Sequence, residues 1–401
     1  MVYVHPLGND NNSGERTAPL RTLAAAVRRD SHVTMLSGIY PPQEASGLTR
    51  PTVVQFEEVV IDGGLGDQVR AILSGDLEID TAPLVKQPCI TANNSLHQLT
   101  IEPAYIGASL VLRNAGRGVS AYRNSGGVYL NGGTFHNLIG RAFGGTADNM
   151  TVTHSRFYDC VLENYDHRIG KRTGAGGTWA ACVGSWKWSE SRPAKGLMVN
   201  NCHFGEGIWG ETVGLFDLDG ATVAGNTFYN SSHTAAIYGS SASNVLAQGN
   251  TIIIDELCPR KDEWRGNSRL PHGIFVGKEG GDNYHAVHNW TICNNTIIGG
   301  TNGIYAGWVQ SPMAFDLMIE RNTVMGQEGE AVLIKNWQGM ISGVGSYLGN
   351  STDQAAVLSC GAWAIAGNRV LGETASCPPD ARRIVVDVTT DGGKIKYEVS
   401  G

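Results

Sequence analysis

Short segments built around an asparagine recur along the chain and constrain its fold more than any other feature. They read NNCHF (200–204), GNTFY (225–229), GNTII (249–253), NNTII (294–298), RNTVM (321–325) and GNRVL (367–371). The second residues are Asn201, Asn226, Asn250, Asn295, Asn322 and Asn368, at separations of 25, 24, 45, 27 and 46 residues. A repeat of roughly 24 residues, in which some intervals span two repeats or an expanded one, predicts a solenoid with one coil per repeat.

Each repeat contains three short apolar elements. The second element reads GIW (207–209), AIY (236–238), GIF (273–275), GIY (303–305) and AVL (331–333). Glycine accounts for 53 of 401 residues, which suits tight turns and disfavours helices. We therefore predict an all-β fold, a single-stranded right-handed parallel β-helix with three strands per coil. The asparagines are predicted to form a ladder at a turn, each side chain bonding to the next coil and tolerating the left-handed conformation.

Three regions are expected along the chain. We predict that residues 1–45 form an N-terminal cap, made of a polar loop, a short helix from about Leu20 and a first strand. Residues 46–380 are predicted to form the β-helix itself. Residues 381–401 alternate around an Asp-Gly-Gly turn and predict a C-terminal β-hairpin cap. Caps at both ends would cover strand edges that otherwise promote association.

The first forty residues also carry a spaced pattern that resembles the opening of secreted β-helix proteins acting on carbohydrates. The matching residues are Gly8, Asp10, Asn12, Gly14, Pro19, Thr22, Leu23, Ala26, Val33, Leu36, Gly38 and Tyr40. The segment 205–307 resembles the general repeat of the pectate-lyase-like superfamily. The resemblance implies the parallel β-helix fold of polysaccharide lyases, glycoside hydrolases and phage tailspikes, and a polysaccharide as the partner.

Charge and hydropathy exclude two classes of partner. The net charge is −7, and no basic run is longer than Arg28-Arg29, so nucleic-acid binding is disfavoured. No stretch of 18 apolar residues predicts a membrane span. The chain begins MVYVHP, without the pattern of a signal peptide. We expect an extracellular protein, either secreted with a signal peptide absent from this chain or located on a virion surface.

The eight cysteines include no CxxC pair, so a zinc ribbon is not predicted. We interpret them as buried thiols, with disulfides such as Cys160–Cys202 left open.

Strand alternation predicts one outward column of apolar side chains. If Ile208 points into the coil, Trp209 points out, and the same register exposes one residue in each later repeat. The column comprises Trp209, Tyr238, Phe275, Tyr305 and Leu333. An apolar stripe of this size indicates a contact surface. It is either a groove in which sugars stack on aromatic rings, or a surface buried beneath long loops or against sister chains in a trimer.

Charged and aromatic residues flank this column at strand ends and in the long segments 163–188 and 255–273. The candidate substrate-binding residues are Trp209, Tyr238, Tyr305, Trp308, Trp337, Trp186, Lys187, His167, Arg168, Lys171 and Arg172. The candidate catalytic residues are Lys278, Glu279, Glu211 and Lys335. Cationic and carboxylate groups together in long loops indicate an acidic polysaccharide as the substrate.

Two reaction types fit these residues. In β-elimination a lysine, arginine or histidine removes the proton next to the uronate carboxyl, and a cation or calcium stabilises the enolate. In hydrolysis two carboxylates flank the glycosidic bond, and Glu211 with Glu279 or Asp217 is the candidate pair. Asp217 and Asp219, in FDLDG, predict a turn rather than a calcium site. We assign no metal ligand, and calcium is the one cofactor left open.

The expected function is therefore that of an extracellular protein that binds or degrades an acidic polysaccharide, as a lyase or a glycoside hydrolase if it is an enzyme. The alternatives are a trimeric virion tailspike or surface fibre, which can itself be a depolymerase, and a non-catalytic adhesin or scaffold. The sequence leaves monomer and homotrimer open.

Overall fold

A computed structural model describes fifteen stretches of the chain. These are residues 1–74, 87–166, 171–172, 181–185, 193–230, 234–258, 269–278, 287–309, 317–329, 332–335, 341–342, 347–349, 355–356, 384–390 and 393–399. The contacts divide the chain into two units, each described by itself. The first unit contains described residues 1–185 and 194–210, and the second contains Pro193 and the described residues from 211 onwards.

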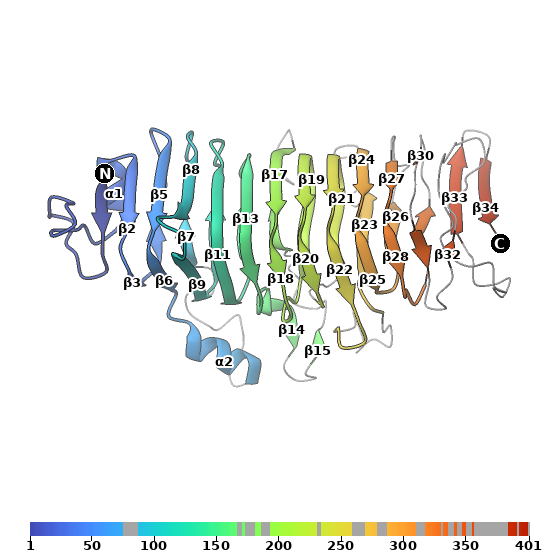
Figure 1. The fold of residues 1–401 in the computed structure, drawn as a ribbon, viewed down its shortest axis with the longest axis horizontal. Helices are drawn as coiled ribbons and strands as arrows, with labels where there is room; N and C mark the ends of the chain where they lie inside the picture. The colour runs from blue at the N-terminus through green and yellow to red at the C-terminus, as the bar shows by residue number, and fades with distance from the viewer. Residues whose placement is uncertain are drawn as a thin grey trace. The chain divides into compact units, whose positions relative to one another are not determined.

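The first unit is a stack of coils in which parallel strands form three rows (Figure 1). The first row contains β1 (Val2–Val4), β2 (His32–Met35), β5 (Thr52–Phe56), β8 (Leu99–Pro103), the starts of β11 (Val128–Leu138) and β13 (Met150–Phe157), and β17 (Ala194–Asn200). The second row contains β3 (Gly38–Tyr40), β6 (Glu58–Asp62), β9 (Ser109–Ala115), the ends of β11 and β13, and β18 (His203–Phe204). The third row contains β4 (Gln43–Glu44), β7 (Pro88–Thr91), β10 (Arg117–Ala121), β12 (Phe143–Gly145) and β16 (Ala181–Ser185).

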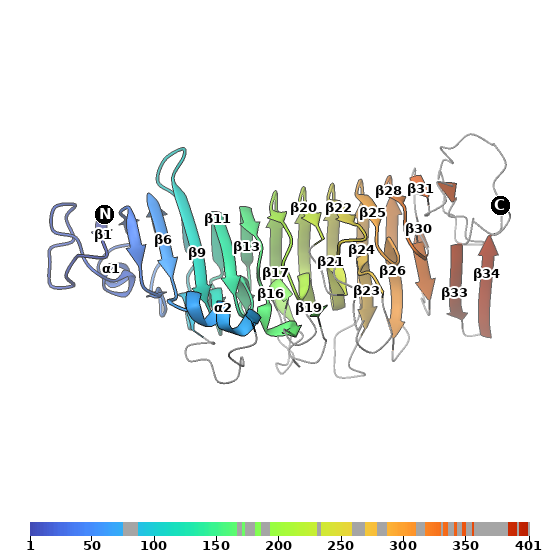
Figure 2. The same ribbon diagram turned by 90° about the horizontal axis from the view of Figure 1, so that it is seen from below.

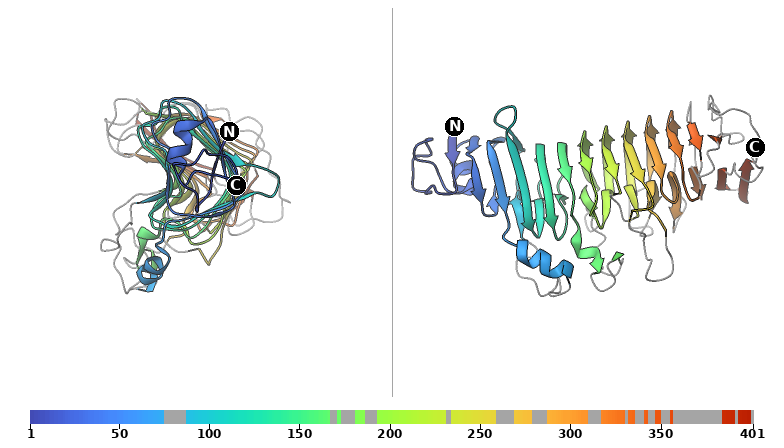
Figure 3. Two further views of the ribbon diagram at one scale, coloured as in Figure 1. Left: turned by 90° about the vertical axis from the view of Figure 1, so that its left-hand side faces the viewer. Right: turned by 60° about the horizontal axis from the view of Figure 1, so that its bottom comes forward.

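Helices of the first unit lie at its margins. Helix α1 (Leu23–Arg29) contacts β1, β2 and β4, and α2 (Gly66–Ser74) projects outside the coils (Figure 3). A 3-10 turn, η2 (Leu162–Asn164), precedes β14 (Tyr165–Asp166), which pairs antiparallel with β15 (Lys171–Arg172). Among the described residues, neither helix has the length and apolar character needed to cross a membrane.

The second unit has the same three-row construction (Figure 2). One row contains the starts of β19 (Glu211–Ala224) and β21 (Ala235–Gln248), then β23 (His272–Lys278), β26 (Ile304–Val309), β29 (Val332–Lys335) and β33 (Ile384–Thr390). The next contains the ends of β19 and β21, then β24 (His288–Cys293), β27 (Leu317–Glu320) and β30 (Ile341–Ser342). The last contains β20 (Thr227–Tyr229), β22 (Thr251–Ile254), β25 (Thr296–Gly299), β28 (Thr323–Met325) and β31 (Tyr347–Gly349).

Two further strands complete the second unit. β32 (Ala355–Ala356) pairs antiparallel with β31, and β34 (Gly393–Val399) forms an antiparallel hairpin with β33. The predicted C-terminal hairpin is therefore present. Its predicted role in covering an end of the stack stays a prediction. The predicted region boundaries at residues 45 and 380 also stay predictions. The parallel pairing of successive coils confirms the predicted right-handed parallel β-helix.

The asparagine ladder is confirmed in the second unit. The side-chain Nδ2 of Asn226, Asn250 and Asn295 donates in each case to Oδ1 of the asparagine one coil later, over 2.9 Å. The side-chain Nδ2 atoms of Asn250 and Asn295 also each donate a hydrogen bond to a backbone carbonyl oxygen of the preceding coil, over 2.8 and 2.9 Å. Asn226, Asn250, Asn295 and Asn322 are all buried, so the ladder pairs polar groups that water does not reach.

The left-handed residue of this turn is the one before each ladder asparagine. Gly225, Gly249, Asn294 and Arg321 have φ values of 65°, 63°, 55° and 50°. Asn201, with φ 53°, occupies this same left-handed position. The residue after it, Cys202, immediately precedes His203, which is in register with Arg156. The alignment of Asn201 with the ladder asparagines is thus wrong by one residue.

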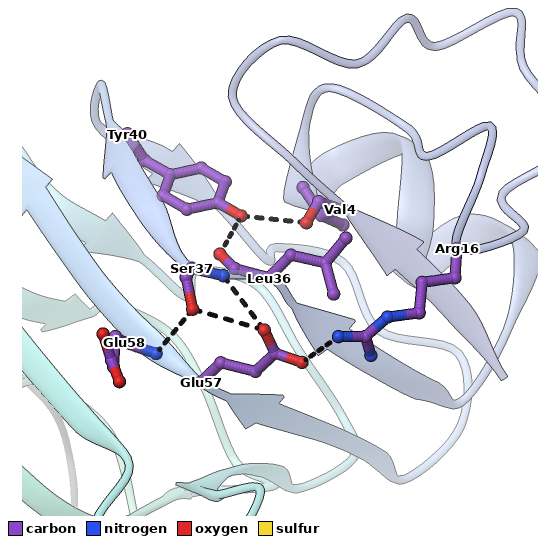
Figure 4. A network of polar contacts seen from close by, with 7 residues as sticks. All are labelled: Val4, Arg16, Leu36, Ser37, Tyr40, Glu57 and Glu58. Carbon is purple, nitrogen blue, oxygen red and sulfur yellow. Dashed lines mark hydrogen bonds and ion pairs between the residues drawn. The ribbon is translucent and has the colours of Figure 1, made fainter.

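The N-terminal motif residues form a network of hydrogen bonds that joins loop, helix and strands. The Tyr40 hydroxyl lies 2.8 Å from the Val4 carbonyl oxygen and 2.7 Å from that of Leu36 (Figure 4). Burial raises the pKa of the Tyr40 hydroxyl well above its usual range. Nearby, Arg16 forms an ion pair with Glu57, with nitrogen and oxygen 2.8 Å apart. The predicted helix begins at Leu23 rather than near Leu20, because Thr22 is its N-cap and accepts a hydrogen bond from the amide of Ala25.

Candidate functional site

The predicted aromatic column exists in the second unit. Register pairs Tyr238 of β21 with Phe275 of β23, and Phe275 with Tyr305 of β26. Tyr305 is paired in turn with Leu333 of β29. The rings of Tyr238 and Phe275 stack at 4.8 Å, whereas Phe275 meets Tyr305 edge-on at 5.3 Å. We call Tyr238, Phe275 and Tyr305 the aromatic column.

Two of the three rings are buried although they lie on the outer side of the strands. Ile237 is fully buried, and a Cβ on Gly239 would meet the buried indole of Trp290 at 2.4 Å. Because neighbouring side chains alternate between faces, Tyr238 between them points away from the interior. Its exposed fraction is nevertheless 2 %, and that of Phe275 is 3 %. Burial within a single chain, one of the two interpretations of the stripe, therefore applies to these rings.

Trp209 does not belong to this column. The residue opposite Tyr238 in the preceding strand is Gly214, five positions later than the sequence alignment implied. Trp209 instead follows the bridge between Cys160 and Ile208, and its amide donates to the carbonyl oxygen of Cys160 over 3.0 Å. The prediction failed because the strand of this coil begins at Glu211, after a turn with Gly207 at φ 77°.

Glu211 was predicted to point outward, and this is also wrong. It lies two residues before Val213, which is in register with the buried Ile237, so strand alternation places it on the inner face. Its exposed fraction is 1 %, and the first eight residues of β19 are all buried. Asp217, the alternative carboxylate for hydrolysis, has φ 48° and an exposed fraction of 2 %. Asp219 accepts a hydrogen bond from Asn244 over 2.6 Å. Both aspartates lie within β19, where Asp217 has a left-handed backbone conformation in place of a separate turn. Within the described ranges no group of three or more potential metal ligands occurs.

Polar groups surround Tyr305 at one end of the aromatic column. The His272 ring lies edge-on to the Tyr305 ring, with centroids 5.2 Å apart. Asn302 Nδ2 is 3.2 Å from His272 Nδ1, and Asn302 is buried. Burial raises the pKa of the Tyr305 hydroxyl, and the exposed Arg269 partly opposes this shift. We call Tyr305, His272, Asn302 and Arg269 the Tyr305 corner.

Two predicted residues lie on the strands that carry the Tyr305 corner. Lys278 is the last residue of β23, half-buried and in register with Val309. The backbone of Trp308 pairs with Gly277, after a register shift between Val276 and Gly277. Lys335 ends β29 opposite Asp387 of β33. Lys278 and Trp308 thus lie on the strands that carry Phe275 and Tyr305, and their roles in binding or catalysis stay predictions.

For the remaining predicted residues, the structure describes no side-chain positions. Glu279, Trp337, Trp186, Lys187, His167 and Arg168 lie outside the described residues. For Lys171 and Arg172 the structure gives only the backbone of β15, paired with Tyr165 and Asp166. Their roles in substrate binding or catalysis stay predictions.

The sequence analysis missed a second column, on β6, β9 and β11 of the first unit. Asp62 forms an ion pair with Arg113 over 2.9 Å, and Arg113 is in register with His136. The His136 ring stacks on that of Tyr158, with centroids 5.1 Å apart. Burial lowers the pKa of His136, and Arg113 lowers it further. None of these coils carries the asparagine marker, so only the strand register brings the four residues together.

Fold and surface together define a parallel β-helix protein with an aromatic outer column. No protein-family model matches the chain, and no curated protein matches it. Among solved structures, a surface protein and adhesin of Streptococcus pneumoniae, PfbA, is similar with a TM-score of 0.54 at 11 % identity, covering 81 % of this chain and 93 % of that one. An alginate lyase from Paenibacillus sp. has a TM-score of 0.48 at 11 % identity, covering 82 % and 91 %. At this identity the similarity shows the shared fold alone.

Proposed function

We propose that the chain is an extracellular β-helix protein that binds an acidic polysaccharide at the Tyr305 corner. The observation that carries this proposal is the half-buried Tyr305 ring with His272 against its edge and the cationic Arg269 close by. An aromatic ring beside hydrogen-bonding groups suits a sugar ring, and Arg269 with Lys278 supplies positive charge for a carboxylate. The buried Phe275 ring meets Tyr305 edge-on from the adjacent coil, and Tyr238 stacks on Phe275 from the coil before it.

Elimination is the reaction that these groups support best. The pKa of the Tyr305 hydroxyl is raised, so this group is protonated at neutral pH and can donate a proton to a leaving oxygen. Lys278 or His272 would remove the proton next to the carboxyl, and Arg269 would stabilise the resulting negative charge. The hydrolytic alternative loses support because Glu211, a member of its predicted pair, is buried.

Adhesion without catalysis is the second candidate. One solved structure with a TM-score above 0.5 is described as a surface protein and adhesin, and this motivates a binding test independent of turnover. The virion tailspike or fibre and the homotrimer remain alternatives. Burial of Tyr238 and Phe275 within one chain removes one reason to invoke sister chains.

A panel of uronate-containing and neutral polysaccharides tests the proposal. Binding is measured by affinity electrophoresis, and elimination by the ultraviolet absorbance of unsaturated uronates. We expect retention by at least one acidic polysaccharide, weakened in Tyr305→Ala and Lys278→Ala. Lys195→Ala, which changes an exposed lysine of the first unit, is the matched control and should behave like the wild type. Absence of retention by every acidic polysaccharide would refute the proposal, whereas retention without absorbance would favour the adhesin.

A further inference from the structure

Two columns of side chains run side by side along the second row of the first unit, and the outer one ends a coil early. In the inner column Phe135, Phe157 and Phe204 stack at 4.7 and 4.8 Å. In the outer column Arg113 and His136 are in register, and Tyr158 stacks on His136. The register that pairs Phe157 with Phe204 places Gly205 beside Tyr158, and the Gly205 amide donates to the Phe157 carbonyl oxygen over 2.8 Å. The inner column therefore has a ring in this coil where the outer column has only a glycine.

The position beside Tyr158 is open. A Cβ on Gly205 would have no heavy atom nearer than 3.8 Å; the three nearest would be His203 Nε2, the Phe157 carbonyl oxygen and Tyr158 Cβ. Tyr158 is 37 % exposed, although one face of its ring is covered by His136. Since consecutive coils are about 4.8 Å apart, the space next to the free face is about as thick as one stacked ring. We call this space, bounded by Tyr158, Gly205 and His203, the Tyr158 slot.

Two carboxylate residues come next along the chain after the Tyr158 slot, and Asp159 Oδ1 lies beside Gly207, 2.2 Å from where a Cβ on that glycine would be. Asp159 and Glu206 follow Tyr158 and Gly205 on adjacent strands, and the Asp159 amide donates to the Glu206 carbonyl oxygen over 3.2 Å. Burial raises the pKa of Asp159, and the neighbouring Glu206 raises it further. Glu206 and His203 are exposed, so their side chains can bind a ligand from solvent.

We propose that the Tyr158 slot binds one uncharged pyranose unit of a glycan, stacked on the free face of Tyr158. The ring would continue the outer column, and its hydroxyls would donate to Asp159 and Glu206 and accept from His203. The two carboxylates discriminate against a uronate at this position by charge repulsion. This site lies in the first unit and shares no residue with the Tyr305 corner. It takes from the proposed function only the ligand class, a saccharide.

Filling the slot is the sharpest test, because Gly205 tolerates a side chain. Gly205→Tyr adds the missing ring, at a backbone position that is not left-handed and where a Cβ has room. Tyr158→Ala removes the stacking face, and Tyr158→Phe keeps it. Tyr105→Ala, which changes a tyrosine 48 % exposed in the loop before β9, is the matched control.

Saturation-transfer NMR with the methyl pyranosides of glucose, galactose, mannose, N-acetylglucosamine and glucuronic acid provides the readout. We expect transfer to at least one uncharged glycoside and less to the glucuronide. The signal should vanish in Gly205→Tyr and Tyr158→Ala and persist in Tyr158→Phe and Tyr105→Ala, with circular dichroism unchanged in all four. No transfer to any uncharged glycoside, or transfer that survives in Gly205→Tyr, overturns the Tyr158 slot. Both of these results concern the Tyr158 slot alone. Failure of the proposed function is detected separately, by the polysaccharide binding of Tyr305→Ala.

Discussion

Tyr238 and Phe275 stack with ring planes 6° apart and centroids 4.8 Å apart, on strands joined by residues 249–271 and paired in register. That spacing equals the distance between neighbouring parallel strands, so the ring contact follows directly from the stacking of coils. Both rings point outward and are buried nonetheless. The pair therefore contributes to stability and, through Phe275, positions Tyr305 at the end of the column.

Removing a central ring of the aromatic column should destabilise the second unit. We expect Phe275→Ala to lower the free energy of unfolding by about 3–5 kcal/mol, because a buried ring is replaced by a cavity. Tyr238→Phe should change it by less than about 1.5 kcal/mol, since the stacking ring is kept. Urea unfolding followed by circular dichroism measures both. Equal unfolding midpoints for wild type and Phe275→Ala would show that the ring is not buried in solution.

A single substitution in the asparagine ladder should lower the free energy of unfolding. Asn250→Ala leaves the side chains of Asn226 and Asn295 each without one partner in a buried setting. Each unmet buried group costs about 1–3 kcal/mol, so we expect a loss of several kcal/mol in the free energy of unfolding. Asn11→Ala, at an exposed loop position, is the control and should be close to neutral. Similar melting temperatures for the two variants would contradict the ladder.

The six described cysteines should resist thiol reagents in the folded protein. Cys89, Cys160, Cys182, Cys202, Cys258 and Cys293 are all buried and outside any disulfide. Burial raises the pKa of Cys89 and of Cys202 to about 12, so little reactive thiolate forms at neutral pH. Reaction with Ellman's reagent should be slow in buffer and complete in denaturant, with alkylated peptides assigning each cysteine. A Cys160–Cys202 disulfide, which the sequence left open, would appear as a linked peptide and would contradict the buried, unbridged thiols.

Lowering the pH should destabilise the N-terminal loop, because acid protonates the Asp10 carboxylate. Burial acts to raise the pKa of Asp10, but hydrogen bonds from Thr22 and Arg21 outweigh it and hold the pKa below the ordinary value of 3.8. The stabilisation is thus complete above the unfolded-state pKa and is lost as the pH falls through the lower folded-state pKa. Asp10→Asn should reduce stability at neutral pH and narrow the difference from wild type in acid. A difference that stays constant from neutral pH into acid would exclude a contribution from this carboxylate.

The same network predicts the effect of a substitution at the helix cap. Thr22 donates to Asp10 over 2.8 Å and accepts from the amide of Ala25 over 3.2 Å. Thr22→Ala removes both contacts and should lower the free energy of unfolding by about 1 kcal/mol. Ser13→Ala, at an exposed position of the same loop, is the matched control. Equal loss in both variants would mean that α1 does not depend on its cap.

Sequence reasoning succeeded where a marker fixed the register. Asn250 and Asn295 lie 45 residues apart, yet their buried side chains bond, and the same alignment correctly brought Phe275 and Tyr305 together. It failed at Trp209, where the coil carries Cys202 in place of an asparagine and an additional turn delays the strand. Periodicity shows which side of a strand a residue occupies, but not what covers it, so the sequence left the choice between a groove and a buried stripe at Tyr238 open.

The Tyr158 slot was beyond sequence reasoning for a related reason. The segments GGTFHN (132–137) and HSRFYD (154–159) are similar enough to align His136 with Tyr158, but only strand pairing brings in Arg113. A glycine in a glycine-rich chain also gives no signal of its own. Gly205 gains meaning only from the stacked Phe157 and Phe204 beside it.

Cross-linking of residues in neighbouring coils tests the central claim, the register of the coils, most directly. Thr227 and Thr251 are paired across β20 and β22, whereas Thr227 and Ile253 are offset by two residues on the same face. Cysteine pairs are introduced at each combination, and the protein is mildly oxidised and mapped by mass spectrometry. The account predicts a disulfide for Thr227→Cys with Thr251→Cys and little for Thr227→Cys with Ile253→Cys, because Cα atoms more than about 7 Å apart cannot be bridged. Equal cross-linking of both pairs, or of the offset pair alone, would contradict it.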